Sequence, residues 1–564
     1  MTLRLSGSPR LFHPRSSLAI ATLVAVAAAL PALAHSPTQR SGAFKACKTS
    51  AHPGDKTFKH LSAPYNQRAT YDALKNTPLW KQAITPLWVN IDKSKPCFAM
   101  SDTPVWGKVV GKIPADVVGL QISDDGRNAL VYVSGIPDYM METPKLFASF
   151  KPGNTYNVFK VSSEPKPDAS AKHELASRGA IGFFVNGVSI FNYTDTFSYN
   201  DKGVWSYDAN VAEASIVNSD VSHATPSDLP QFPKSRGIFH NHQMSIELLH
   251  QLKDPYYRGV REHSRLVGFA LDSYPIYGPL GYSSKDKASG IKTLQSSYVK
   301  RNWLTVTGGG TGNRSSVPDW LVRHWDASHE AGSELLNIFA KKKSDILFTD
   351  GGKEGPVTYS GDDAKLAAEI ASLNKSKTLL RDTQGYVYWE AEVRMPNGKT
   401  AKARNYVLKS SDLWGATVGQ EILPVSYQVA DKDKFLFKAT VGAFAEDYEF
   451  IAGYGDLDFY NGIDSYIPER GQSVYHYVAS FSAKVSDRKR LTTASFPYVV
   501  GVQYRGMVDA FNAAQDDKAK AKYLVDNASR YKTVFDLGVI GRGDDGKAER
   551  GSVIETWRKM LGED

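Results

Sequence analysis

His240 and His242, separated by one asparagine, are the side chains of this sequence with the clearest capacity for chemistry. Residues two apart share a face of an extended strand, so a strand over residues 238–243 would point both imidazoles in one direction. Two neutral imidazoles that converge in this way form half of a metal site. The remaining ligands must come from other parts of the chain.

Several residues elsewhere are candidates to complete such a site. His223 precedes the pair on a predicted loop that also carries Asp220, and Asp272 follows the pair inside an apolar run. A carboxylate in apolar surroundings needs a metal, an arginine or backbone amides as a partner. His263 lies in the same following segment, and the last candidates lie in the C-terminal half. The predicted metal ligands are His240, His242, Asp272, His223, His476, Asp456 and Asp458.

The residue types of this set leave the identity of the ion open. Imidazoles combined with a carboxylate suit zinc, copper, manganese or iron. Calcium is the alternative around residues 453–464, where Asp456, Asp458 and Asp464 offer oxygen ligands near a glycine. The same residues are typical of a turn whose carboxylates accept hydrogen bonds from backbone amides. We therefore expect a divalent metal ion, with copper, zinc and calcium as the candidates.

The first 34 residues are typical of a secretory signal peptide. Arg4, Arg10 and Arg15 precede an apolar stretch at residues 18–30, and the sequence ALA at residues 32–34 suits cleavage. The apolar stretch is short for a membrane span, and no other stretch approaches the ~20 apolar residues that a span needs. An uncleaved anchor is the alternative. We expect a periplasmic or extracellular protein with no membrane span after cleavage.

The composition indicates a large globular protein. Of the 564 residues, 42% are hydrophobic and 23% are charged, which allows a packed core and argues against extended disorder. The formal net charge of +9 is scattered along the chain, which favours a solvated surface over nucleic-acid binding. Cys47 and Cys97 are the two cysteines, and in an oxidising compartment they most simply form one disulfide.

Short apolar runs between turn residues predict a mainly β fold with antiparallel, sandwich-like sheets, helical insertions and a helical C-terminal tail. Residues 180–192 predict a hairpin with a type I′ turn at Asn186-Gly187, and residues 386–408 predict another hairpin. A short helix over residues 205–215 would carry Glu213, and residues 245–253 have helical spacing. Residues 151–173 are expected to form a surface loop, and residues 496–506 to complete the β region.

The segment GIFHNH at residues 237–242, followed by GFALDSYPIYGPLGY at 268–282, resembles the YHYH family of secreted proteins. Further blocks resemble the family in the same order, at residues 131–139, 183–192, 296–303, 446–462 and 496–506. The four residues of the family's name are Phe239-His240-Asn241-His242 here, so both histidines are kept and both tyrosines are lost. Because the family has no settled biochemical function, the resemblance implies the location of a site and no particular reaction.

This resemblance organises the chain into six parts. We expect a signal peptide at 1–34, an irregular arm at 35–78, the first part of a YHYH-like β domain at 79–284, a partly helical insertion at 285–384, the second part of that domain at 385–506 and a helical tail at 507–564.

Two functions fit these observations. The first is an exported metal-binding protein, and with an open coordination position its ion could activate water or oxygen, as in a metal-dependent hydrolase or oxidoreductase. The second is a non-catalytic secreted module that binds a glycan or a protein. In that module Tyr274, Tyr277 and Trp205 form the binding surface, and the histidines are structural. The expected ligand is an unidentified small molecule or glycan, and no nucleic acid is expected.

Overall fold

The computed structural model describes residues 117–137, 155–170, 179–197, 204–226, 237–302, 316–322, 380–408, 437–481 and 494–561, with gaps at 215, 219, 515, 537–538, 543–547 and 551. It also describes residues 58–60, 88–90, 100–105, 108–114, 152–153, 176, 314, 339, 416, 418–419 and 421–422. The predicted signal peptide, the predicted disulfide between Cys47 and Cys97, and most of residues 303–379 lie outside the described residues.

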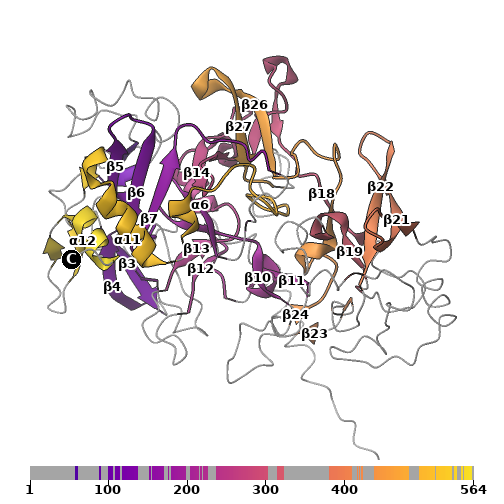
Figure 1. Ribbon diagram of the computed structural model, residues 1–564, viewed down its shortest axis with the longest axis horizontal. Coiled ribbons are helices and arrows are strands. Elements are labelled where there is room, and N and C mark those ends of the chain that lie inside the picture. The colour runs from indigo at the N-terminus through magenta and orange to yellow at the C-terminus, as the bar shows by residue number, and fades with distance from the viewer. Residues whose placement is uncertain are drawn as a thin grey trace, which may run out of the picture.

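An eight-stranded sheet forms the centre of the fold (Figure 1). The strand order is β12 (Ser222–Ala224), β13 (Phe239–Asn241), β9 (Ser189–Phe191), β8 (Ala180–Phe184), β14 (Leu266–Ala270), β15 (Pro275–Tyr277), β27 (Gln472–Val478) and β26 (Gly462–Ile467). The pairs β13–β9 and β15–β27 are parallel, and the other neighbours are antiparallel. Strands β8 and β14 are buried almost throughout, as expected for the apolar runs AIGFF and LVGFA in the middle of a sheet.

A second sheet packs against the first and shares its core. Its strand order is β1 (Phe58–His60), β2 (Trp88–Asn90), β5 (Val117–Ser123), β6 (Asn128–Val133) and β7 (Asn157–Ser162), and β28 (Tyr531–Asp536) also pairs with β5. Phe159 of β7 stacks on Phe183 of β8 with ring centroids 4.5 Å apart, so one hydrophobic core joins both sheets. Helix α12 (Val553–Met560) buries Trp557 in this core.

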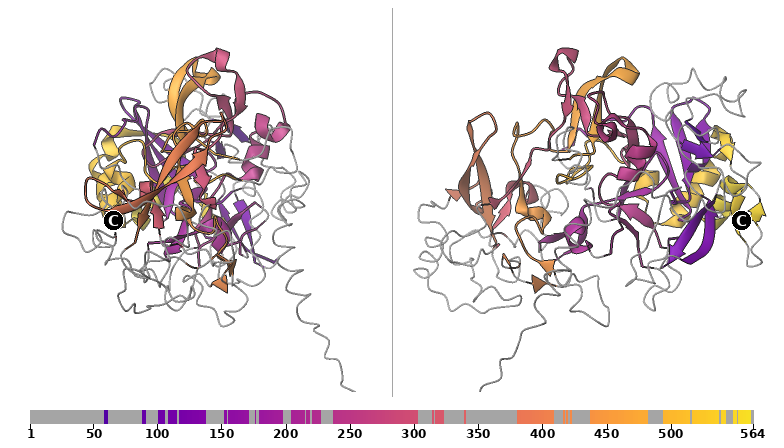
Figure 2. Two further views of the ribbon diagram at one scale, coloured as in Figure 1. Left: turned by 90° about the vertical axis from the view of Figure 1, so that its right-hand side faces the viewer. Right: turned by 180° about the vertical axis from the view of Figure 1, so that it is seen from behind.

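Smaller sheets and short helices complete the fold. The remaining strands are β3 (Met100–Val105), β4 (Lys108–Pro114), β10 (Thr194–Phe197), β11 (Ser206–Asp208), β16 (Leu280–Tyr282), β17 (Ile291–Thr293), β18 (Tyr298–Lys300), β19 (Ser316–Pro318), β20 (Leu380–Arg381), β21 (Val387–Arg394), β22 (Thr400–Val407), β23 (Glu421–Ile422), β24 (Phe437–Lys438), β25 (Tyr448–Phe450), β29 (Val539–Arg542) and β30 (Ala548–Arg550). Among the described residues, the other α-helices are α5 (Ala209–Ala212), α6 (Ile246–Gln251), α7 (Pro255–Arg258), α10 (Ala510–Ala513) and α11 (Asp517–Asp526). The 3₁₀ helices are η3 (Lys287–Ser289), η9 (Ala445–Asp447), η10 (Pro468–Arg470) and η12 (Ala528–Arg530). The β21–β22 hairpin and helix α12 lie at opposite ends of the molecule (Figures 1 and 2).

A buried ion pair ties the segment before β19 to the region around η9. The Arg314 guanidinium donates to both carboxylate oxygens of Asp447, at 2.8 and 3.0 Å, and neither side chain is exposed. The same guanidinium donates to the carbonyl oxygens of Ala439 and Thr440. A buried ion pair needs such complete hydrogen bonding to offset the loss of hydration.

The mainly β fold with mostly antiparallel sheets and a C-terminal helix is confirmed, and so are both predicted hairpins. The turn type predicted at Asn186-Gly187 was wrong. A type I′ turn needs a positive φ at both central residues. Of the two central residues, only Gly187 has a positive φ, at 86°. The Gly187 N–H donates to the Phe184 carbonyl at 2.8 Å. The connection is therefore a type I turn closed by a glycine bulge.

Three local expectations also differ from the structure. Residues 496–506, all of them described, form a buried, turn-rich segment with no sheet strand, because their apolar side chains do not alternate between core and solvent. The expected loop at 151–173 contains strand β7, and the expected helix at 205–215 is strand β11 followed by the single turn α5. The domain boundaries remain predictions. None of the helices among the described residues has the length and apolar character needed to span a membrane.

Candidate metal centre

Strands β12 and β13 bring two histidines side by side. They pair antiparallel with His223 opposite His240, and residues directly opposite in a sheet have side chains on one face. His223 was predicted on a loop, but it lies in the middle of β12. His242 follows β13 by one residue and shares the face of His240, as the two-residue period of a strand requires.

Glu213 joins these histidines from the end of helix α5. Asp208 begins this helix by accepting a hydrogen bond from the Asn210 backbone N–H at 3.0 Å. The Glu213 N–H closes the helix by donating to the Ala209 carbonyl at 2.9 Å. The Glu213 carboxylate then reaches the imidazoles of His223 and His242.

The four side chains meet in the interior of the protein, with exposed fractions between 2% and 7%. Glu213 Oε2 lies 3.0 Å from His223 Nε2 and 2.8 Å from His242 Nε2. The Nε2 atoms of His240 and His242 are 3.2 Å apart, and one ligand atom from each residue lies within 4.8 Å of all the others. Tetrahedral ligands ~2.0–2.1 Å from an ion are about 3.3 Å apart. The shortest distances between ligand atoms already match a metal coordination shell. The longest, which is at most 4.8 Å, would have to shorten by at most about 1.5 Å.

Backbone carbonyls fix the orientation of two of the imidazoles. Nδ1 of His240 lies 2.8 Å from the Ile238 carbonyl oxygen, and Nδ1 of His242 contacts the Asn192 carbonyl oxygen. A carbonyl only accepts, so each Nδ1 carries a proton and donates it. In a neutral ring Nε2 then presents a lone pair, which is the way metal-binding histidines are oriented. Two such lone pairs 3.2 Å apart require a cation between them, either a proton or a metal ion.

The charges of the cluster show where a proton lies in the absence of metal. Burial disfavours the charged imidazole of His242, but the Glu213 carboxylate outweighs this effect and raises the pKa of His242. Burial and the neighbouring imidazoles hold the pKa of His240 well below its usual range. Burial also opposes ionisation of Glu213, yet His223 and His242 hold the pKa of its carboxyl well below its usual range. These directions favour a proton on His242 beside an ionised Glu213, and a bound metal ion would displace that proton.

Two neighbouring side chains keep the centre in place. The Phe191 ring stacks on His240 with centroids 3.8 Å apart. Asp220, which lies near His223 in sequence, accepts hydrogen bonds from the backbone N–H groups of Ile246 and Glu247 at 2.7 and 3.1 Å. An anion at a helix N-terminus is stabilised by these N–H groups, so Asp220 anchors the segment before β12 to helix α6.

The structure brings together His223, His240 and His242 from the predicted ligand set and places the others elsewhere. Asp272 accepts hydrogen bonds from the Tyr477 hydroxyl at 2.6 Å and from the Gly506 N–H at 2.9 Å, and burial raises its pKa to about 6. It therefore has the backbone and hydroxyl partners that a buried carboxylate needs. His476 lies on β27 beside His263, with ring centroids 6.2 Å apart.

Asp456 and Asp458 lie in the turn between β25 and β26, with their carboxylates engaged. Asp456 contacts Lys292 Nζ at 2.6 Å and accepts from the Gln295 N–H at 3.0 Å. Asp458 accepts from the N–H groups of Tyr460 and Gly462 and from the Tyr475 hydroxyl. These contacts are those of a turn in which carboxylates accept from backbone amides.

The aromatic residues of the second hypothesis do not form an outer surface. Trp205, Tyr274 and Tyr277 are 0%, 5% and 1% exposed, respectively. A glycan or protein partner stacks on rings that it can reach from solvent, so these three side chains cannot provide the proposed binding strip.

The sequence reasoning did not include Glu213 among the ligands. The residue stands ten positions before His223 with no spacing motif between them, and it reaches the histidines only through the tertiary packing of α5, which lies against β10 and β11. Its place on a short predicted helix, next to a histidine-bearing segment, was the available signal.

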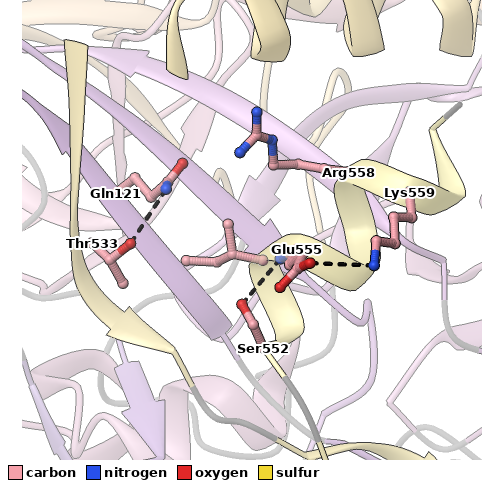
Figure 3. Close-up of a pocket in the computed structure, with 7 residues that line it drawn as sticks. Gln121, Thr533, Ser552, Glu555, Arg558 and Lys559 are labelled. Atoms are coloured by element: carbon pink, nitrogen blue, oxygen red, sulfur yellow. Dashed lines mark hydrogen bonds and ion pairs between the residues drawn. The ribbon is translucent and has the colours of Figure 1, made fainter. Parts of the chain in front are cut away.

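A surface pocket lies in a different part of the molecule, between β5, β28 and α12 (Figure 3). Its polar groups pair with one another: Gln121 Nε2 donates to Thr533 Oγ1 at 3.3 Å, and Lys559 lies 3.2 Å from Glu555. The pocket has no histidine in its lining and is separate from the centre.

Comparison with known proteins shows that the four residues of the centre lie within a family domain. The family model described as YHYH protein matches residues 158–336 and 406–490, and all four residues of the centre lie in the first of these segments. Neither a search of curated proteins nor a search of solved structures found a match. The chain therefore contains a YHYH domain, which is formed by two separate segments of its sequence.

Proposed function

We propose that this protein is an exported metal-binding protein that holds one divalent transition-metal ion through Glu213, His223, His240 and His242. Export is supported by the positive start, apolar stretch and small-residue cleavage site of the first 34 residues. Metal binding is supported by the buried cluster inside the YHYH domain.

One observation carries the proposal. The Nε2 atoms of His240 and His242 lie 3.2 Å apart, while both Nδ1 atoms are committed to backbone carbonyls. A histidine that is only hydrogen-bonded in a core normally directs each ring nitrogen at a partner that is not another imidazole. Here two acceptor nitrogens and one carboxylate oxygen converge, so the cluster is built to surround a positive charge.

The donor set favours zinc or copper over calcium. Three imidazole nitrogens suit a borderline ion of the first transition series, whereas calcium takes six to eight oxygen ligands. The four protein ligands are all buried. A site with four protein ligands is typical of an ion that is retained, while a catalytic zinc site keeps one position for water. The geometry therefore favours a stably held ion.

Metal content measures this proposal directly. Wild-type protein and a His240→Ala/His242→Ala variant are dialysed against Zn²⁺, and bound zinc is measured by elemental analysis. We expect the wild type to retain one more ion per chain than the variant. Asp272→Asn is the matched control, because Asp272 is equally buried and lies outside the centre. Equal zinc content in wild type and the double variant would overturn the proposal.

A further inference from the structure

A second pair of buried histidines lies toward the opposite edge of the eight-stranded sheet. His263 precedes β14 and is 9% exposed, and His476 lies on β27 and is 1% exposed. Their ring centroids are 6.2 Å apart. The buried Tyr277 ring packs edge-on against both imidazoles, with centroids 5.4 Å from His263 and 5.2 Å from His476.

Both imidazoles are oriented as in the first centre. Nδ1 of His263 lies 2.8 Å from the Ser264 carbonyl oxygen, and Nδ1 of His476 lies 2.8 Å from the Val474 carbonyl oxygen. Each Nδ1 therefore carries the proton, and each Nε2 is left with a lone pair. Nε2 of His263 is buried and has no hydrogen-bond partner within the described part of the chain. Leaving a buried acceptor without a partner is unfavourable, so the site suits a ligand that accepts this lone pair.

A proton does not fill this role at neutral pH. Burial lowers the pKa of His263, and burial together with the nearby His263 lowers the pKa of His476 to about 3. Both imidazoles are therefore neutral and available as ligands. The surroundings are apolar on one side, where Leu294, Ile463 and Val478 belong to one hydrophobic cluster.

The formal charges facing the pair nearly cancel. Arg265 lies 3.4 Å from Glu469 and Lys285 lies 2.7 Å from Asp464, so the acids near the pair already have basic partners. With no carboxylate in the pair itself, the site offers no net negative charge. A monovalent ion loses less hydration than a divalent ion on entering such a site.

We propose that His263 and His476 bind one soft monovalent cation of the Cu⁺ class, with the two Nε2 atoms as its ligands. Such ions accept two ligands in a nearly linear arrangement, unlike zinc, which takes four. For ligand bonds of ~2 Å, two imidazole rings that share one ion in this way have centroids about 6 Å apart. The observed 6.2 Å agrees with this value.

Gly281 packs close to His263. A Cβ at this position would be in ordinary contact with His263 Nε2, at 3.6 Å, and would clash with Leu294 Cδ1 at 2.8 Å. Gly281 lies on β16, which crosses this end of the sheet near β26. A larger residue at this position would displace Leu294 from its place beside His263.

Ag⁺ is a suitable probe because it has the same two-ligand preference as Cu⁺ and is not oxidised in air. Ag⁺ is titrated by calorimetry into the wild type, a His263→Gln/His476→Gln variant and a His240→Gln/His242→Gln variant. We expect one Ag⁺ site to vanish in the first variant and to persist in the second. Tyr277→Phe is the control and retains the site, because its hydroxyl is no ligand.

Two results would overturn the inference. One is an Ag⁺ isotherm for the His263→Gln/His476→Gln variant that equals that of the wild type. The other is Ag⁺ binding that is lost only with His240 and His242, which would assign the ion to the first centre. Should the first variant fail to fold, imidazole ¹⁵N spectra of the wild type decide: the Nε2 signals of His263 and His476 must shift together on adding one equivalent of Ag⁺, and unshifted signals reject the site.

Discussion

Replacing Glu213 with glutamine tests the charge on which the first centre depends. Glu213 Oε2 is the shared neighbour of His223 Nε2 and His242 Nε2, at 3.0 and 2.8 Å, and the side chain is 7% exposed. Glutamine has nearly the same shape, so the substitution removes one negative charge and leaves the packing in place. The variant therefore isolates the electrostatic contribution of one ligand.

The expected loss of affinity follows from Coulomb's law. Two unit charges about 4 Å apart interact by about 4 kcal/mol at an effective dielectric constant of about 20. A divalent ion carries twice that charge, but Glu213 already faces a proton on His242 in the metal-free centre, so the net loss is about one such interaction, about 4 kcal/mol. Each 1.4 kcal/mol corresponds to about a factor of ten in Kd. Glu213→Gln should therefore weaken Zn²⁺ binding by about a thousandfold.

Competition with a chelator of known zinc affinity measures this change. Glu446→Gln is the matched control, because Glu446 is 1% exposed, undergoes the same substitution and lies outside the four-residue cluster. Its carboxylate binds the N–H and hydroxyl of Ser206, which a glutamine amide can also do. A folded Glu213→Gln protein with the zinc affinity of the wild type would refute the reasoning, since the carboxylate would then not be a ligand.

Three further predictions concern stability. Burial raises the pKa of Glu446 to about 8, so the native state keeps a proton that the unfolded chain releases. The free energy of unfolding should therefore fall by about 2 kcal/mol from pH 6.5 to 8. Urea denaturation at both pH values measures this fall. Glu446→Gln should make it smaller by this amount, and the buried Asp208, whose pKa is raised to about 7, supplies a further part. Asp220→Ala should cost about 1–3 kcal/mol in the same assay, because it leaves N–H groups of helix α6 without their acceptor, and zinc should still bind. Loss of zinc without loss of stability would instead make Asp220 a ligand. Arg314→Met should cost about 3–5 kcal/mol, because it leaves Asp447 charged and buried, and a smaller change than about 1 kcal/mol would contradict the pairing.

Local patterns in the sequence predicted much of the fold. The hairpin around Asn186-Gly187 and the strand that carries His476 depend on neighbouring residues, so alternation and turn residues were sufficient to find them. Residues 496–506 were misread because a buried loop and a strand can have the same apolar composition, and here the side chains pack on several sides of the chain. The turn type depends on φ at Asn186, which an Asn-Gly pair alone does not determine.

The candidate centre was predictable in part for the same reason. His240 and His242 share a face because of the strand period, which the sequence contains. The place of His223 depends on the register between β12 and β13, and a shift of one residue would turn its imidazole to the other face of the sheet. Glu213 reaches the centre through tertiary packing of α5, and Asp272 is satisfied by Tyr477 and Gly506 from distant segments. No periodicity in the sequence encodes these contacts.

The pairing of β15 with β27 imposes an order on how the domain assembles. Ile276 meets Tyr477 across about 200 residues, and closing so long a loop costs about 3 kcal/mol more than closing a ten-residue one. Strands β8, β9, β12, β13 and β14 come from a short stretch of chain and can associate without β27, which lies about 200 residues further along. We therefore expect the half of the sheet that gathers Glu213 and the three histidines to form before β26 and β27 join it.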